Sequence, residues 1–172
     1  MDAVIGRRPW RQWVAKRCTT SLGAFGVTAV VALGSCGPAA LQCAPAPAAP
    51  ASIAAPSSAV QQVVDLTNAR RADNGLGPLT LSAALTNAAQ AHSADQAATN
   101  TMSHAGSDGS NLADRLARAG YRATTWAENV AAGYPDATAV MSGWMNSPGH
   151  RANILNGNFT QIGVGVAYSA NG

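Results

Sequence analysis

The segment from Trp144 to Val166, WMNSPGHRANILNGNFTQIGVGV, constrains the fold more than any other part of the chain. Pro148 suits the first position of a helical turn, and Ser147 suits the residue that caps it. His150 then lies in the first turn of a short helix, where unpaired N–H groups and the helix dipole disfavour a positive charge. We therefore expect His150 to be neutral near pH 7, and able to accept a hydrogen bond or bind a metal.

The end of this segment predicts a strand with one bare face. Bulky residues at 162, 164, 166 and 168 alternate with Gly163, Gly165 and Ala167, which is the two-residue period of a strand. The glycine face has almost no side chains, so another element can approach it closely. An Ala-rich helix is expected from Ser82 to about Asn100. The bare face and this helix are together compatible with a ligand groove.

Three motifs occur together in the later part of the chain: MSHAG at 102–106, AENVAAG at 127–133 and WMNSPGHRANIL at 144–155. This combination resembles the CAP domain, the family of cysteine-rich secretory proteins, antigen 5 and plant pathogenesis-related proteins, in its bacterial SCP-like branch. The resemblance covers residues 57–172. It implies an α/β fold, a three-layer α/β/α sandwich with a small antiparallel sheet.

The resemblance also shows a departure at the end of the sheet. Family members usually carry a closing aromatic strand after a hairpin turn, and that strand is apparently missing after Tyr168. Either the sheet has an open edge beside Ile162–Tyr168, or this chain is a shortened version of a longer protein. An open apolar edge favours aggregation.

The chain divides into three parts: a leader at 1–43, a Pro/Ala-rich linker at 44–58 and the domain at 59–172. The leader has a basic start followed by an apolar run, Leu22–Leu33, and small residues, as a signal peptide does. The run is shorter than the roughly 20 residues that span a bilayer; a retained short anchor is the alternative. The linker composition is typical of extended, disordered spacers.

All three cysteines lie within residues 1–43, so the domain itself can form no disulfide. Leu33-Gly34-Ser35-Cys36 resembles a bacterial lipobox, in which Cys36 would be the site of lipid attachment. Simple cleavage among the small residues at 35–50 is the alternative. We expect a secreted or extracytoplasmic protein that meets a membrane only through its leader or a lipid anchor.

The charge distribution argues against a nucleic-acid partner. Residues 1–43 hold five basic residues and one acid, whereas the remainder holds six arginines and seven acids. The basic character therefore belongs to the leader, and the domain has no basic footprint for nucleic acid.

Helices are expected at four further places in the domain. The first follows Ser58 and ends at Asn74-Gly75, with Arg70 and Arg71 facing solvent. The Ala-rich helix follows, and His92 on it is interpreted as a core or edge histidine satisfied by a neighbour. A third helix, 112–120, is capped by Asn111, and a fourth, 137–146, is capped by Asp136.

A strand is expected from Tyr121 to Val130. Alternation places Trp126, Glu128 and Val130 on one inward face, and Trp126 and Trp144 are expected to be core aromatics. Glu128 would then be a partly buried carboxylate, which needs a partner.

The resemblance implies a central cleft in which two histidines and acidic residues meet. Carried over by position, these are His104, Glu128 and His150; the position of the family's second glutamate holds Ser147, so the set is incomplete. The three side chains could hold a divalent cation such as zinc, with water in the fourth position. Alternatively, they form a satisfied polar network. A hydrolase triad with Ser103 or Ser147 lacks a nucleophile elbow.

Three alternative functions are compatible with a domain of this family that has His104, Glu128 and His150 in its cleft. The first is a binding module at the cell envelope for lipid-like small molecules or envelope or host proteins. The second is a metal-dependent hydrolase in which Glu128 is the general base and His104 and His150 hold the ion. The third is a structural envelope protein. The missing second glutamate favours binding over enzymatic activity.

Overall fold

The computed structural model describes residues 27–35 and 58–169. The five helices are α1 (Ser58–Ala72), α2 (Ala83–Thr99), α3 (Leu112–Arg118), α4 (Ala137–Asn146) and α5 (Pro148–Ile154). The four strands are β1 (Val27–Ser35), β2 (Thr80–Leu81), β3 (Thr125–Tyr134) and β4 (Gln161–Tyr168). Cys36 and the linker up to residue 57 lie outside the described residues.

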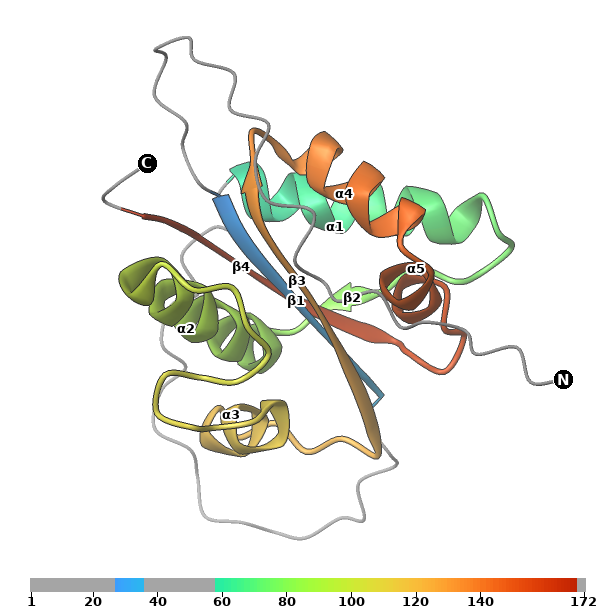
Figure 1. Ribbon diagram of the computed structural model, residues 1–172. Coiled ribbons are helices and arrows are strands. Elements are labelled where there is room, and N and C mark those ends of the chain that lie inside the picture. The colour runs from blue at the N-terminus through green and yellow to red at the C-terminus, as the bar shows by residue number, and fades with distance from the viewer. Residues whose placement is uncertain (1–26, 36–57, 170–172) are drawn as a thin grey trace, which may run out of the picture.

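The sheet lies between two layers of helices. Its strand order is β2-β4-β1-β3. Figure 1 shows α1, α4 and α5 on one side of the sheet and α2 and α3 on the other, which confirms the three-layer α/β/α sandwich. The sheet is not wholly antiparallel, because the two residues of β2 pair in parallel with Gln161 and Ile162 of β4.

β1 occupies the centre of the sheet. It pairs antiparallel with β3 on one side and with β4 on the other, so that Val30 lies opposite both Val130 and Gly165. Leu33 is completely buried. β1 includes much of the apolar run that we assigned to the leader from the sequence. It also pairs with the strand edge at Ile162–Tyr168 that was expected to be open.

The main core lies between the sheet and the layer of α1 and α4, and Trp144 is buried there as predicted. Trp126 is not a core residue, because its side chain is 44% exposed. The predicted alternation holds for Glu128 and Val130, which are buried. However, the strand begins at Thr125 rather than Tyr121, so Trp126 lies at the end of the sheet, opposite Gly34, where the core no longer covers it.

The glycine face of β4 is covered by α2. A Cβ atom added to Gly163 would lie 2.1 Å from the carbonyl carbon of Leu85, and one added to Gly165 would lie 2.3 Å from that of Ala89. The expected close approach is therefore confirmed. Because the helix backbone fills this space, the expected groove between the bare face and the Ala-rich helix does not exist.

Arg71 is buried, and the prediction that it faces solvent is wrong. Its side chain is 2% exposed and donates hydrogen bonds to four carbonyl oxygens that come from different parts of the chain. These carbonyls belong to Gly77, Ile154, Asn156 and Phe159. Arg71 thus joins the end of α1 to the loop between α5 and β4. Arg70 is exposed and pairs with Asp73, as a solvated helix end does.

The helix ends follow the sequence closely. Asn111 and Asp114 form a reciprocal capping box at α3, and Asp136 accepts a hydrogen bond from the backbone N–H of Ala139 at α4. Ser147 and Pro148 begin α5 as predicted, although the Ser147 side chain makes no capping hydrogen bond. Within residues 27–35 and 58–169, no helix has the length and hydropathy that crossing a bilayer requires.

Candidate functional site

Glu128 is the centre of a buried ionic chain. Its side chain is 4% exposed, and its two carboxylate oxygens have different partners. Arg115 Nη2, from α3, donates to Oε1 at 2.8 Å, and His104 Nδ1, from the loop before α3, lies 2.9 Å from Oε2. Because a carboxylate only accepts, we assign the proton of this bond to His104 Nδ1. The predicted need of Glu128 for a partner is confirmed.

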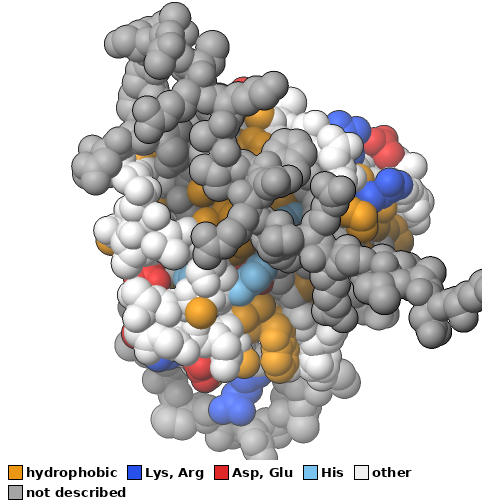
Figure 2. Space-filling view, in the orientation of Figure 1, with side chains coloured by type: hydrophobic (Ala, Val, Ile, Leu, Met, Phe, Trp, Pro, Cys, Tyr) orange, Lys and Arg blue, Asp and Glu red, His pale blue; other side chains and the backbone are white. Residues whose placement is uncertain are grey.

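Two asparagines hold the backbone of His150 beside the ion pairs of Glu128. Asn129 Nδ2 donates to the carbonyl oxygen of His150 at 3.1 Å, and Asn153 Nδ2 donates to Asn129 Oδ1 at 2.8 Å. Burial is the main cause that lowers the pKa of His150, and the nearby charge of His104 lowers it further. The direction agrees with the expected neutral imidazole. The fold therefore brings His104, Glu128 and His150 to one region. Figure 2 shows histidine side chains at the surface of one face beside hydrophobic ones.

The contacts of Glu128 weigh against its use as a direct ligand of zinc. Both oxygens of Glu128 already accept hydrogen bonds, and the guanidinium of Arg115 beside them disfavours a second cation. In the part of the chain that the structure describes, no three His, Cys, Asp or Glu side chains are grouped to hold a metal ion. The chain of contacts resembles the alternative interpretation, a polar network that joins strand, helix and loop.

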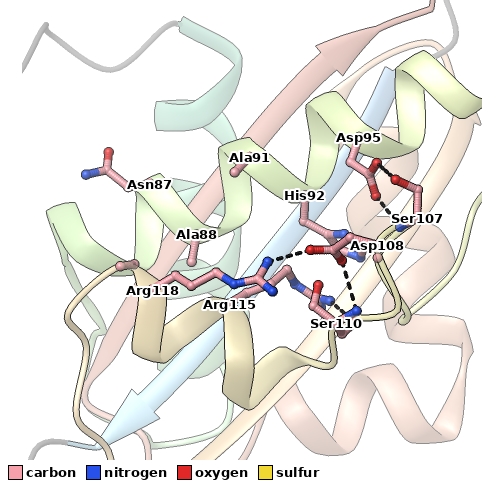
Figure 3. A pocket seen from close by; sticks show the side chains of 12 residues that line it. Asn87, Ala88, Ala91, His92, Asp95, Ser107, Asp108, Ser110, Arg115 and Arg118 are labelled. Atoms are coloured by element: carbon pink, nitrogen blue, oxygen red, sulfur yellow. Dashed lines mark hydrogen bonds and ion pairs between the residues drawn. The ribbon is translucent and has the colours of Figure 1, made fainter.

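A separate cavity of about 570 Å³ lies between α2, α3 and the loop at 106–110 (Figure 3). Its size is typical of small-molecule sites. Its polar lining includes the side chains of Asn87, His92, Asp95, Asp108, Arg115 and Arg118, with Ser107 and Ser110. Arg115 contributes both to this lining and to the pair with Glu128, so the cavity adjoins the buried ionic chain.

His92 lies at the inner wall of the cavity and is 1% exposed. Its Nε2 lies 2.9 Å from the carbonyl oxygen of Ser103, which confirms a buried histidine satisfied by a neighbour on one side of the ring. Its Nδ1 is buried and has no hydrogen-bond partner among the described residues. Burial, followed by the positive charge of Arg115, lowers the pKa of His92, while Glu128, Asp95 and the bond to Ser103 oppose this shift.

Two carboxylates lie at the outer part of the cavity. Asp95 accepts hydrogen bonds from the side chain and the backbone N–H of Ser107, and these bonds lower its pKa. Asp108 accepts from Ser110 and forms an ion pair with Arg118 at 2.6 Å, and these contacts, those of Ser110 first, hold its pKa well below the usual range. Both groups are ionised at neutral pH.

Sequence reasoning missed Arg115 and the cavity. The signal for Arg115 was the predicted burial of Glu128, which requires a cation or donors nearby. Among the arginines of the domain, Arg115 is on the inner face of α3, three residues before the exposed Arg118. The cavity had no such signal, because its walls come from two helices and a loop whose approach is set by packing.

The buried His92 gives a prediction for the pH dependence of stability. Because its pKa is lowered in the folded state, the unfolded chain binds the proton first as the pH falls below about 6.5. The contribution of neutral His92 to the free energy of unfolding is therefore complete above pH 6.5. It is lost as the pH falls toward the pKa of His92 in the folded state. It amounts to at most about 2 kcal/mol between pH 6.5 and 5. Urea unfolding at pH 7.5 and 5 should show a smaller loss for His92→Phe than for the original chain, and an equal loss would contradict the assignment.

Comparison with known proteins identifies the fold family. The family model described as CAP, the cysteine-rich secretory protein family, matches residues 64–172. The uncharacterized protein YkwD of Bacillus subtilis (strain 168) is 40% identical over 121 residues, which are 70% of this chain and 46% of that protein. The uncharacterized membrane protein YlbC of the same organism is 38% identical over 106 residues, 62% of this chain and 31% of that protein.

A solved structure shows the same fold. The crystal structure of an extracellular protein containing a SCP domain from Bacillus anthracis str. Ames has 40% sequence identity and a TM-score of 0.61, and the match covers 63% of this chain and 36% of that one. This chain thus spans less than half the length of each of these relatives. The family model matches more than half of the chain and includes His104, Glu128 and His150, so the chain belongs to the cysteine-rich secretory protein (CAP) family, with a bacterial SCP-like domain.

Proposed function

We propose that this CAP domain is an extracytoplasmic binding module that holds a small molecule in the cavity between α2 and α3. The observation that carries the proposal is the cavity itself, which has a volume of about 570 Å³; His92 in its wall has a buried Nδ1 with no partner among the described residues. Buried polar atoms are rarely left unpaired in a native fold. The extracellular Bacillus anthracis relative supports the location.

A thermal-shift panel tests this function. We expect at least one class among fatty acids, neutral sugars and short peptides to raise the melting temperature of the full chain, because a ligand at one hundred times its Kd adds about 2.7 kcal/mol. Ala91 is exposed and lines the cavity, so Ala91→Trp should fill it and abolish the shift. Ala94→Trp, on the same helix and also exposed, is the matched control and should retain it. If no class shifts the melting temperature, the structural role is favoured instead.

The metal-dependent hydrolase is the second candidate, because the fold brings His104 and His150 to one region. The engaged carboxylate of Glu128 opposes it. We expect calorimetric titration of the full chain with zinc at neutral pH to give no saturable heat. Saturable binding that is lost in both His104→Ala and His150→Ala would overturn this expectation and favour the hydrolase.

Lipid attachment at Cys36 is the proposed route to the envelope, supported by the lipobox-like sequence before it. The cleavage that it requires would remove β1, so the lipidated form would have a sheet without its central strand. In cells that process lipoproteins, Cys36→Ser should move the protein from the membrane fraction to the medium. Unchanged fractionation would exclude Cys36 as the anchor and leave simple secretion.

A further inference from the structure

We propose that Asn156-Gly157, in the turn between α5 and β4, is a site of spontaneous deamidation, and that Arg71 directs this reaction to its isoaspartyl product. The chain contains the Asn-Gly dipeptide at 74–75, 156–157 and 171–172. The last pair lies outside the described residues. The two described pairs differ in the hydrogen bonds of the atoms that react, so the fold determines which of them is modified.

Deamidation of this dipeptide needs water as its only co-reactant. The backbone nitrogen of Gly157 attacks Cγ of Asn156, a new C–N bond closes a succinimide, and the side-chain nitrogen leaves as ammonia with the proton of the Gly157 N–H. Glycine favours this attack because it has no Cβ to hinder the approach. Water then opens the succinimide. Attack at Cγ gives aspartate, whereas attack at the main-chain carbonyl carbon gives isoaspartate, in which that carbonyl has become a carboxylate.

The hydrogen bonds around Asn156-Gly157 favour the first step. The side-chain Oδ1 of Asn156 accepts a hydrogen bond from the backbone N–H of Asn158 at 2.9 Å. A donor at this oxygen stabilises the negative charge that develops on it during the attack on Cγ. The N–H of Gly157 donates to no group in the described part of the chain, and Gly157 is exposed. The attacking nitrogen therefore has no hydrogen bond to break.

Asn74-Gly75, at the end of α1, is held in the opposite way. The N–H of Gly75 donates to the carbonyl oxygen of Ala72 at 3.0 Å, and Asn74 Nδ2 donates to that of Arg70 at 2.8 Å. The first bond occupies the attacking nitrogen, and the second holds the leaving group. Both must break before a succinimide can form, and each contributes to the barrier. This pair is thus an internal reference with the same dipeptide sequence.

Arg71 acts on the second step. It is buried, and among the described residues it forms no ion pair with an Asp or Glu side chain. Its Nη1 donates to the main-chain carbonyl oxygen of Asn156 at 2.9 Å. When water attacks this carbonyl carbon, the guanidinium stabilises the negative charge on the oxygen, so the succinimide opens to isoaspartate. The carboxylate that results lies against the guanidinium, where charge-assisted hydrogen bonds are stronger than neutral ones.

The rates of the two pairs in the full chain test the site. The chain is kept at mildly alkaline pH, folded or in concentrated urea, and tandem mass spectrometry of its peptides locates each deamidated residue. We expect Asn156 to react at least about fivefold faster than Asn74 in the folded chain, the factor that one hydrogen bond represents. In urea the two rates should converge. A folded rate at Asn74 equal to or above that at Asn156, or the same ratio of rates in urea, would overturn the proposal.

Gly157→Ala tests the attacking atom. The added Cβ hinders the approach of the nitrogen to Cγ, whereas within the fold it meets only Leu76 Cδ2, at 3.5 Å. Deamidation of Asn156 should slow several-fold, and that of Asn74 should stay unchanged. An unchanged rate at Asn156 would mean that the nitrogen of Gly157 is not the nucleophile and would overturn the proposed reaction.

The share of isoaspartate at residue 156 tests the role of Arg71, and a methyltransferase specific for isoaspartate measures it. We expect a larger share in the folded chain than in urea, and Arg71→Met should lower the folded share to the value in urea. If this variant fails to fold by circular dichroism, the comparison of the folded chain with the chain in urea still decides. Equal shares in these two conditions, or an unchanged share in folded Arg71→Met, would contradict the role of Arg71.

Discussion

Gly163→Ala is expected to destabilise the domain by about 3 kcal/mol or more, which is a large part of the stability of a domain of this size. The added Cβ would lie 2.1 Å from the carbonyl carbon of Leu85 and 2.3 Å from the amide nitrogen of Thr86. Both atoms belong to the backbone of α2, so no side chain can rotate to make room. The helix and the sheet must separate, and the packing along the whole of their contact is lost. Urea unfolding measures the effect.

Gly157→Ala is the matched control for this substitution. A Cβ atom there would meet only Leu76 Cδ2, at 3.5 Å, which is an ordinary van der Waals distance. Its free energy of unfolding should stay within about 0.5 kcal/mol of the original. Equal stability of the two variants would show that α2 does not pack on the glycine face of β4.

Arg71→Met is expected to cost about 4 kcal/mol, because it keeps most of the side-chain volume but removes four hydrogen bonds. The carbonyls that Arg71 joins would be left without their donor, and the buried ones carry the full cost of desolvation. Burial lowers the pKa of Arg71, yet the guanidinium stays charged far above neutral pH. Arg71→Lys should restore only part of the loss, since an ammonium group cannot span all four acceptors.

The neighbouring residue provides the control. Arg70→Met removes a pair with Asp73 at 3.2 Å in which both side chains are about half exposed or more, 47% and 61%. Such pairs contribute between about 0 and 1 kcal/mol. Chemical denaturation of both variants should therefore separate them widely. A similar small cost for Arg71→Met would contradict the role assigned to its buried side chain.

These two arginines show what the sequence can and cannot predict. The repeat of apolar residues along the first helix and the helix end at Asn74-Gly75 are local signals. The observed helix α1 agrees with both of them. The burial of Arg71 depends on carbonyls up to 88 residues away, whose positions are set by the packing of α5 and the turn before β4. The buried stripe of Val60, Val64 and Thr67 does continue at Arg71 and not at Arg70, but the stripe alone does not show which carbonyls would pair with a guanidinium there.

The same distinction holds for the candidate site. Caps at Asn111 and Asp136 were predictable because a capping side chain binds its own helix. The family motifs indicated that His104, Glu128 and His150 belong together, and the fold places them in one region. Arg115, which occupies the other oxygen of Glu128, comes from an ordinary surface-like helix sequence. With Arg115 on one oxygen and His104 on the other, both oxygens of Glu128 have a partner.

The central position of β1 means that any processing before Cys36 would change the sheet itself. Processing before Cys36 would remove Val27–Ser35, and β3 and β4, which run parallel to each other on either side of it, would be left about 9–10 Å apart, twice the normal strand spacing. A β1 that is paired on both sides and a chain processed before Cys36 therefore exclude each other. Limited proteolysis should detect this competition: a chain that begins at residue 44 is expected to be cut within 125–134 and 161–168, where the complete chain resists. Equal resistance would mean that the sheet closes without β1.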